Sequence, residues 1–314
     1  MDYVVTTSKL TKTFGFFTAV NQLSINIRPG EIYGFLGPNG SGKSTTIRML
    51  CGILEPTSGS GKVLGFDLAT EAEKIKPHIG YMSQKFSLYD DLTVYENLNF
   101  YAGLYSVPWR ERQHRIQEMV EMANLTGREK ELAANLSVGW KQRLALGCAI
   151  ISKPAILFLD EPTSGISPTS RKMFFNIIQR LANEGTTVMV TTHFMDEAER
   201  CSSIAFISEG SLIANDTPDN LKNKVIEGVL AELEIEDPMG KLQEIEQLPY
   251  VKECSVHGAL LHVLLEKEQN LVDLQTYTKA RVNKITPSLE DVFIALSRKK
   301  RRVKAGEQDI ICAP

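Results

Sequence analysis

The segment "GPNGSGKS", Gly37 to Ser44, is the feature that most restricts how this chain can fold. It has the pattern G-x-x-x-x-G-K-[S/T], follows the apolar run "EIYGFL" and leads into a helical pattern. Glycines in such a loop let consecutive backbone N–H groups surround a phosphate, and the start of the helix adds positive potential. The sequence therefore predicts a strand, a phosphate-binding loop and a helix in direct succession.

The side chains of this loop predict a nucleoside triphosphate site. Lys43 supplies a mobile charge for the outer phosphates, and the hydroxyl of Ser44 suits Mg²⁺. The residues expected to bind the nucleotide are Gly37, Pro38, Asn39, Gly40, Ser41, Gly42, Lys43, Ser44 and Thr45.

A second motif, "ILFLDEP", is an apolar run that ends in two acidic residues, Asp160 and Glu161. An apolar strand ending in aspartate is the usual arrangement by which proteins with such a loop hold Mg²⁺ through water. We therefore expect Asp160 to be a metal ligand. Glu161, one residue later, is expected to polarise a water molecule against the γ-phosphate.

Apolar runs of strand length alternate with helical patterns along the first two thirds of the chain, which predicts an α/β domain with a sheet covered on both faces. A purely helical stretch from Thr93 to Asn124 reads as an insertion. Residues 229–297 predict strand, helix, two strands, helix, strand and a last helix. Ser288 is the expected N-cap of that helix, with Asp291 as its capping-box partner.

We predict a first domain over residues 1–224, with its helical part at about 90–150, and a small α+β domain over 225–297. Residues 298–314 form a basic tail, interpreted as disordered, with contact to an anionic membrane surface as the alternative.

The net charge of −3 gives no indication of nucleic-acid binding. No apolar run approaches the roughly 18 residues of a membrane span, and the start of the chain lacks the pattern of a secretion signal. Five scattered cysteines favour reduced thiols over a disulfide framework or zinc site.

Five further segments occur in a fixed order: "KTFGFFTAVNQLS", "GYMSQ", "LSVGWKQRL", "LDEPTSGISP" and "VTTHFMDEAE". Together with the phosphate loop they resemble the ATP-binding subunit of ABC transporters, over about residues 3–222. The segments "TTHFMDEAERC", "IANDTPDNL" and "TPSLEDVFIAL" are similar to ATPases of the ABC-2-type exporter group. The resemblance implies an α/β P-loop NTPase core with an antiparallel β subdomain and a helical insertion, plus a small α+β C-terminal domain.

The resemblance also implies roles for three residues outside the phosphate loop. Phe14 would stack on adenine, although Phe16 or Phe17 is an alternative. Gln84 would ligate Mg²⁺ or the attacking water, and His193 would hold the γ-phosphate and orient Glu161. The other histidines are interpreted as structural or surface residues: His78, His114, His257 and His262.

The segment "LSVGWKQ" resembles the signature that completes the nucleotide site of a second ATPase domain, in a homodimer or with a paralogue. Ser137, Gly139 and Gln142 are the residues expected to contribute to that site. Val138 stands where the commonest signature has glycine, which is tolerable unless the position needs a positive φ. Ser167 replaces a usual aspartate in the loop that crosses to the second domain, which puts coupling between the two sites in doubt.

The implied function is hydrolysis of ATP with Mg²⁺ to drive export through a separate integral membrane permease of the ABC-2 type. The chain would then lie peripherally on the cytoplasmic face of the cell's inner membrane, with no nucleic-acid partner. The alternative is a soluble ABC ATPase acting on ribosomes or nucleic acid. Such proteins usually carry two cassettes or a long coiled-coil insertion, and this sequence shows one set of motifs and no such insertion.

Overall fold

The computed structural model describes residues 2–84 and 87–304 of the chain. These residues form two compact units, which divide between Thr217 and Pro218.

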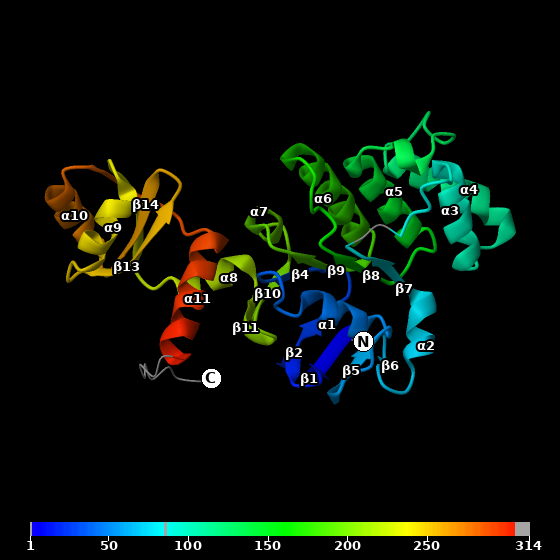
Figure 1. Cartoon of the computed structure of the whole chain (residues 1–314), viewed down its shortest axis with the longest axis horizontal. Coiled ribbons are helices and arrows are strands. Elements are labelled where there is room, and N and C mark those ends of the chain that lie inside the picture. The colour runs from blue at the N-terminus through cyan, green and yellow to red at the C-terminus, as the bar shows by residue number, and fades with distance from the viewer. Residues whose placement is uncertain (1, 85–86, 305–314) are drawn as a thin grey trace. The chain divides into compact units, whose positions relative to one another are not determined.

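The first unit is built on a sheet of six strands in the order β11-β10-β4-β9-β8-β7 (Figure 1). Strands β10, β4, β9, β8 and β7 are parallel, and β11 pairs with β10 in the antiparallel sense. All residues of β4, β8 and β9 are buried, as expected for parallel strands covered on both faces. The strands are β4 (Ile32–Leu36), β7 (Ile79–Met82), β8 (Ile156–Asp160), β9 (Thr187–Thr192), β10 (Ser203–Ser208) and β11 (Ser211–Asp216).

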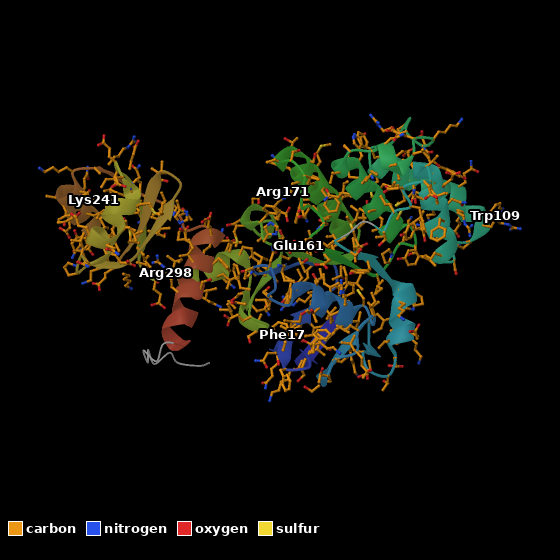
Figure 2. All side chains as sticks on the ribbon, viewed as in Figure 1. Phe17, Trp109, Glu161, Arg171, Lys241 and Arg298 are labelled. Atoms are coloured by element: carbon orange, nitrogen blue, oxygen red, sulfur yellow. The ribbon has the colours of Figure 1, made fainter. Side chains whose placement is uncertain are left out.

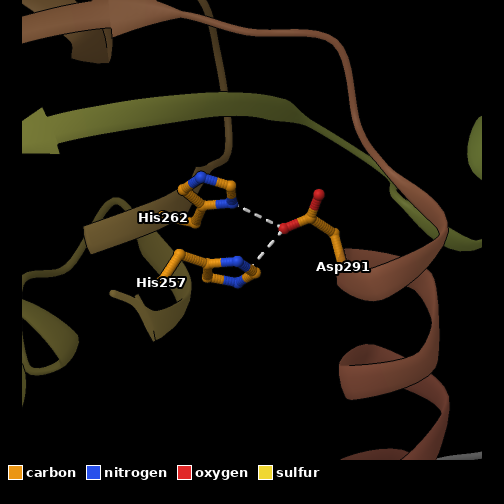
Figure 3. Close-up of side chains that lie close together, drawn as sticks. All are labelled: His257, His262 and Asp291. Atoms are coloured by element: carbon orange, nitrogen blue, oxygen red, sulfur yellow. Dashed lines mark hydrogen bonds and ion pairs between the residues drawn. The ribbon is translucent and has the colours of Figure 1, made fainter. Parts of the chain in front are cut away.

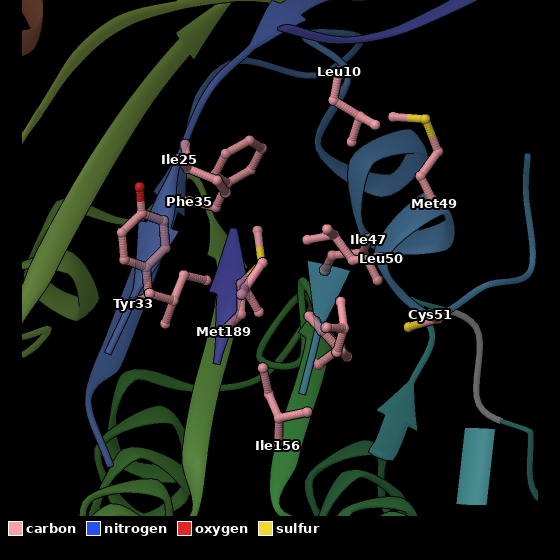
Figure 4. Packing of buried hydrophobic residues seen from close by; sticks show 14 of the residues in the cluster. Leu10, Ile25, Tyr33, Phe35, Ile47, Met49, Leu50, Cys51, Ile156 and Met189 are labelled. Carbon is pink, nitrogen blue, oxygen red and sulfur yellow. The ribbon is translucent and has the colours of Figure 1, made fainter. Parts of the chain in front are cut away.

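A second, antiparallel sheet has the strand order β2-β1-β5-β6, with β3 pairing with β1. Leu10 of this sheet and Ile25, between β2 and β3, share one apolar core with Phe35 and Met189 of the central sheet and Ile47 of the first helix (Figure 4). The predicted α/β core with an antiparallel subdomain is therefore confirmed. The strands are β1 (Val5–Phe14), β2 (Phe17–Leu23), β3 (Asn26–Ile27), β5 (Ser58–Val63) and β6 (Phe66–Asp67).

The predicted helical insertion is also present. Helices α3, α4 and α5 pack against one another, and α3 begins at a capping box between Thr93 and Glu96. The α-helices of the first unit are α1 (Lys43–Leu50), α2 (Ala72–Ile75), α3 (Val94–Leu104), α4 (Trp109–Met122), α5 (Val138–Ile150), α6 (Pro168–Asn183) and α7 (Met195–Ala198). Two 3₁₀ turns, η1 (Lys76–His78) and η2 (Ala133–Asn135), complete the set that the structure describes.

The second unit is an antiparallel sheet in the order β13-β14-β12-β15, with α9 and α10 packed on it around a small apolar core. The predicted order of strands and helices is confirmed, and Ser288 and Asp291 form the expected capping box. The elements are α8 (Pro218–Val225), β12 (Val229–Glu234), α9 (Pro238–Glu246), β13 (Val251–His257), β14 (Leu260–Leu265), α10 (Asn270–Thr278), β15 (Arg281–Lys284) and α11 (Leu289–Lys304).

The basic segment requires a correction, because residues 298–304 continue helix α11 instead of beginning a disordered tail. Arg298 is anchored: its Nη2 donates to the carbonyl oxygen of Cys254 at 2.7 Å, and its Nη1 lies 3.5 Å from Glu246 Oε1. These contacts hold the helix where the charge run starts. The rest of the predicted tail, residues 305–314, lies outside the described residues.

Candidate nucleotide-binding site

The phosphate loop connects the carboxyl end of β4 to α1, and two of its glycines are required by close contacts. A Cβ on Gly37 would lie 2.2 Å from the carbonyl oxygen of Ile207, and one on Gly42 would lie 2.3 Å from that of Ala19. Gly42 also has a φ of +100°, which disfavours any other residue. The hydroxyl of Ser41 is buried and has no hydrogen-bond partner in the described part of the chain. The loop thus holds an unsatisfied donor, as an anion-binding cradle requires.

The tip of this loop and the first turn of α1 hold the other residues predicted to bind nucleotide. Pro38, Asn39 and Gly40 are exposed, and Gly40 has a φ of +78°. Ser44 and Thr45 are partly buried in the first turn of α1. Exposed backbone next to a helix N-terminus is the arrangement that binds phosphate groups.

Lys43 is the first residue of α1, and its ammonium group is almost fully buried, with 4% of the side chain exposed. Its Nζ donates to the carbonyl oxygens of Gly37 at 2.8 Å and Pro38 at 3.2 Å. A third contact, at 3.1 Å, joins it to Oε1 of Glu161. Because an ammonium group has three hydrogens, all of its donors are engaged.

Ser44 and Asp160 come together although 116 residues separate them. The hydroxyl of Ser44 donates to Asp160 Oδ1 at 3.0 Å, and the hydroxyl of Thr191 donates to the same oxygen at 2.9 Å. Hydroxyl and carboxylate oxygens are the ligands that Mg²⁺ prefers, so this pair fits the predicted metal. Sequence reasoning did not identify Thr191, since a threonine inside an apolar strand carries no distinctive signal.

Glu161 is the residue that several other side chains of the site contact, and it is labelled in Figure 2. Its carboxylate is 8% exposed; Oε1 contacts Lys43, while Oε2 accepts a hydrogen bond from Gln84 Nε2 at 3.2 Å and lies 3.7 Å from His193 Nδ1. Its backbone has a φ of +48°, and its N–H donates to the hydroxyl of Thr191 at 2.8 Å. Positive φ is uncommon for a non-glycine residue, although nine other described residues of this chain share it.

The common position of these groups follows from the topology of the sheet. Gln84, Glu161 and His193 each follow the carboxyl end of a parallel strand, namely β7, β8 and β9, and the phosphate loop follows β4. Carboxyl ends of parallel strands lie at one edge of a sheet, where ligands of such folds bind. The structure therefore brings together the loop, Asp160, Glu161, Gln84 and His193.

A buried glutamate, Glu197 in α7, was also missed by sequence reasoning. Its two carboxylate oxygens accept hydrogen bonds at 2.5 Å from Thr163, just after Glu161, and from Thr192, just before His193. Burial raises the pKa of Glu197. Glu197 thus joins by hydrogen bonds the two segments that carry Glu161 and His193. The sequence "MDEAE" contains no pattern that predicts these contacts.

The three phenylalanines considered for adenine stacking lie in the hairpin of β1 and β2. Phe14 is 49% exposed and has Lys12 Nζ 5.3 Å from its ring centroid, while Phe16 and Phe17 are more exposed still. Exposure therefore does not separate the three candidates.

The signature segment lies at the start of α5, where Ser137 is the N-cap residue and Val138 is the first helical residue. Val138 is not among the described residues with a positive φ, so its branched side chain causes no backbone strain. Gln142 is buried and donates to the carbonyl oxygen of Ser164 at 3.0 Å. The hydrogen bonds of Ser137 and Gln142 thus go to α5 and to the loop after β8.

Ser167 is the N-cap of α6, and its hydroxyl accepts a hydrogen bond from the N–H of Ser170 at 3.3 Å.

We expect Ser167→Ala to lower the free energy of unfolding by about 1 kcal/mol, because a helix N–H loses its partner. Ser167→Asp is expected to leave stability equal or higher, since aspartate caps as well and favours the helix dipole. Denaturant unfolding measures both, with Thr169→Ala at an exposed position of the same helix as control. A larger loss with Ser167→Asp than with Ser167→Ala would contradict the capping role.

Comparison with known proteins adds an independent finding. Residues 20–164 match the family model described as "ABC transporter". The chain is 35% identical over 294 residues to Nod factor export ATP-binding protein I of Rhizobium etli, covering 92% of each protein. It is 33% identical over 304 residues to daunorubicin/doxorubicin resistance ATP-binding protein DrrA of Streptomyces peucetius, covering 93% of this chain and 92% of that protein.

A shorter but stronger match joins the chain to the probable multidrug ABC transporter ATP-binding protein YbhF of Escherichia coli. The two are 49% identical over 219 residues, which is 70% of this chain but only 38% of that protein. Among solved structures, the cassette MJ0796, a dimer bound to ADP and Pi, is similar with a TM-score of 0.63 and 26% identity over 68% of this chain and 98% of its own. Clostridium perfringens cbiO1, part of the transporter complex cbiONQ, gives a TM-score of 0.65 and 26% identity over 72% and 95%.

Proposed function

This chain belongs to the ATP-binding proteins of ABC transporters, a family of ATPases, and from that premise we propose that it powers export through a separate membrane permease of the ABC-2 type. The observation that carries the proposal is the convergence of Lys43, Gln84 and His193 on Glu161, beside the oxygen pair of Ser44 and Asp160. Relatives that match almost the whole chain are named for Nod factor export and for drug resistance, which supports export as the direction.

Lys43 is proposed to exchange partners when ATP binds. All three of its hydrogens are engaged, so a phosphate oxygen must replace an existing acceptor. Glu161 is the acceptor to be replaced, because the two loop carbonyls are fixed by the backbone. The released carboxylate then accepts a proton from the water that attacks the γ-phosphate, giving ADP and phosphate. Gln84 and His193 both lie beside Oε2 and orient that carboxylate, and His193 also holds the γ-phosphate.

Ser44, Gln84 and Asp160 are the residues proposed to hold Mg²⁺. The ion would neutralise charge on the transferred phosphoryl group. Thr191 acts as a positioning residue, because its hydroxyl joins Asp160 Oδ1 to the backbone N–H of Glu161.

A second ATPase domain, identical or paralogous, is proposed to complete each nucleotide site. Within one chain the hydroxyl of Ser137 makes no capping hydrogen bond at the start of α5, which leaves it for a nucleotide held by another copy. The N-terminus of a helix presents N–H groups and a positive potential to a phosphate. The dimeric form of the similar cassette MJ0796 supports this assembly.

The permease is proposed to contact the helical insertion. Large apolar side chains are exposed on α3 and α4: Tyr95, Phe100, Leu104 and Trp109. Exposed apolar side chains on a folded protein are candidates for contact with a partner. Within the described part of the chain, every helix falls short of the length and hydropathy of a bilayer-spanning segment. We place the chain peripherally on the cytoplasmic face of the cell's inner membrane.

Co-purification tests the proposed assembly. The tagged chain, extracted from native membranes in mild detergent, is expected to carry one multi-span membrane protein that mass spectrometry identifies. Leu104→Glu, on the exposed surface of α3, is expected to lose that protein while still binding ATP. Val272→Glu, at a similarly exposed position of α10, is the control and should keep it. Absence of any multi-span protein from the wild-type preparation would refute the transporter proposal.

A further inference from the structure

One face of the second unit's sheet is polar where helix α11 begins. His262 of β14 pairs with Glu232 of β12 on one side and with Ser255 of β13 on the other. His257 is two residues from Ser255, so it lies on the same face, diagonal to His262. The first turn of α11 places Asp291 over this pair of histidines (Figure 3).

The three side chains form a compact cluster. His262 Nδ1 lies 2.7 Å from Asp291 Oδ1, and His257 Nε2 lies 3.5 Å from the same oxygen. The rings stack with centroids 3.8 Å apart and planes inclined by 10°. One ligand atom from each residue falls within 4.8 Å of the others. Donor atoms from three separate elements therefore lie close together, although the stacked rings do not yet point at a common centre.

The hydrogen-bonding of this cluster is incomplete. His257 Nε2 is buried, and its 3.5 Å contact with Asp291 Oδ1 lacks the geometry of a hydrogen bond, so this nitrogen has no hydrogen-bond partner in the part of the chain that the structure describes. The two carboxylate oxygens of Asp291 have different partners. Oδ2 accepts hydrogen bonds from the N–H and hydroxyl of Ser288 in the capping box, and Oδ1 faces the histidines. A buried nitrogen without a partner costs free energy that a bound ion would recover.

A small cavity lies beside the cluster. It has a volume of about 20 Å³, enough for one water molecule or ion, and it is lined by His262 and Asp291 but not by His257.

We propose that His257, His262 and Asp291 bind one divalent transition-metal ion of the zinc class. Imidazole nitrogens and a carboxylate are ligands that such ions prefer, and water would complete the tetrahedron. Parallel stacked rings cannot both direct a lone pair at one ion, so the rings must rotate on binding. The ion replaces the hydrogen bond between His262 and Asp291.

Glu232 supports the same arrangement from the next strand. Its Oε2 lies 3.9 Å from His262 Nε2, the nitrogen left free when Nδ1 ligates the ion. A carboxylate that receives this second N–H fixes the tautomer and raises the basicity of a metal-binding histidine. The bound ion would join the hairpin of β13 and β14 to the start of α11, and so stabilise the second unit.

Metal titration of the full chain tests this proposal. The protein is stripped with a chelator and titrated with Zn²⁺ against a chromophoric competitor, in excess Mg²⁺ and without nucleotide, so that oxygen-rich sites are filled. We expect one Zn²⁺ per chain, with affinity at least about tenfold lower in His257→Gln and in His262→Gln. His114→Gln, an exposed histidine beside a glutamate on α4, is the matched control and should bind as the wild type does. Equal zinc affinity in the wild type and the His257→Gln/His262→Gln double variant would overturn the site.

Two further measurements keep the result decisive if a variant fails to fold. Co²⁺ bound to the wild type should show the strong visible absorption of tetrahedral coordination, and Zn²⁺ should abolish it. Zn²⁺ should also raise the Tm of the wild type and of His114→Gln, because an ion that binds only the folded state stabilises it. A Co²⁺ spectrum like that of the aqueous ion, or no change of Tm, would overturn the proposal.

Discussion

Glu161→Gln is expected to abolish ATP turnover while leaving ATP binding equal or tighter. The amide has nearly the shape of the carboxylate but cannot accept the proton of the attacking water, so turnover should fall by at least about a hundredfold. Binding should not suffer, because the neutral side chain no longer competes with phosphate for the ammonium group of Lys43 or repels the γ-phosphate. ATP held without hydrolysis should also trap the dimer.

Phosphate release, equilibrium nucleotide binding and size-exclusion chromatography with and without ATP measure these three effects. Glu71→Gln is the matched control, because Glu71 also pairs with a lysine, at 2.9 Å, but on the surface. It should leave all three measurements unchanged. Rapid hydrolysis by Glu161→Gln would show that another group accepts the proton.

Lys43→Ala is expected to weaken ATP binding by about ten- to a hundredfold, since a charge-assisted contact to phosphate is worth about 1.5–3 kcal/mol. It should also lower the free energy of unfolding, because Glu161 remains buried without its ion pair. Nucleotide titration and denaturant unfolding measure the two effects. Lys74→Ala removes the surface partner of Glu71 and should change neither.

The double variant Lys43→Ala/Glu161→Gln separates the two effects. Removing both charges should restore much of the lost stability, because no unpaired carboxylate remains. It should not restore ATP affinity, which depends on the ammonium group itself. Full recovery of ATP binding in the double variant would mean that Lys43 does not contact phosphate.

The fold was largely predictable from the sequence because its signals are local. The phosphate loop lies between a strand and a helix, and its glycines are required by contacts with neighbouring backbone. The capping box of Ser288 and Asp291 was predictable for the same reason. The prediction that the basic segment is disordered was wrong, because Arg298 is anchored by the carbonyl oxygen of Cys254, on a strand far away in the chain.

The sequence by itself determined which residues are predicted to bind phosphate and Mg²⁺, since Lys43, Ser44, Asp160 and Glu161 lie in motifs formed by neighbours along the chain. Only the tertiary structure decided how these residues pair. Lys43 contacts Glu161, the hydroxyl of Thr191 donates to Asp160, and Glu197 accepts a hydrogen bond from the segment that follows Glu161. The same holds for His257 and His262, interpreted from sequence as structural or surface residues but assembled with Asp291 into one cluster. Strand order and register set these distances, and contacts between distant segments leave no periodicity or spacing that a sequence can reveal.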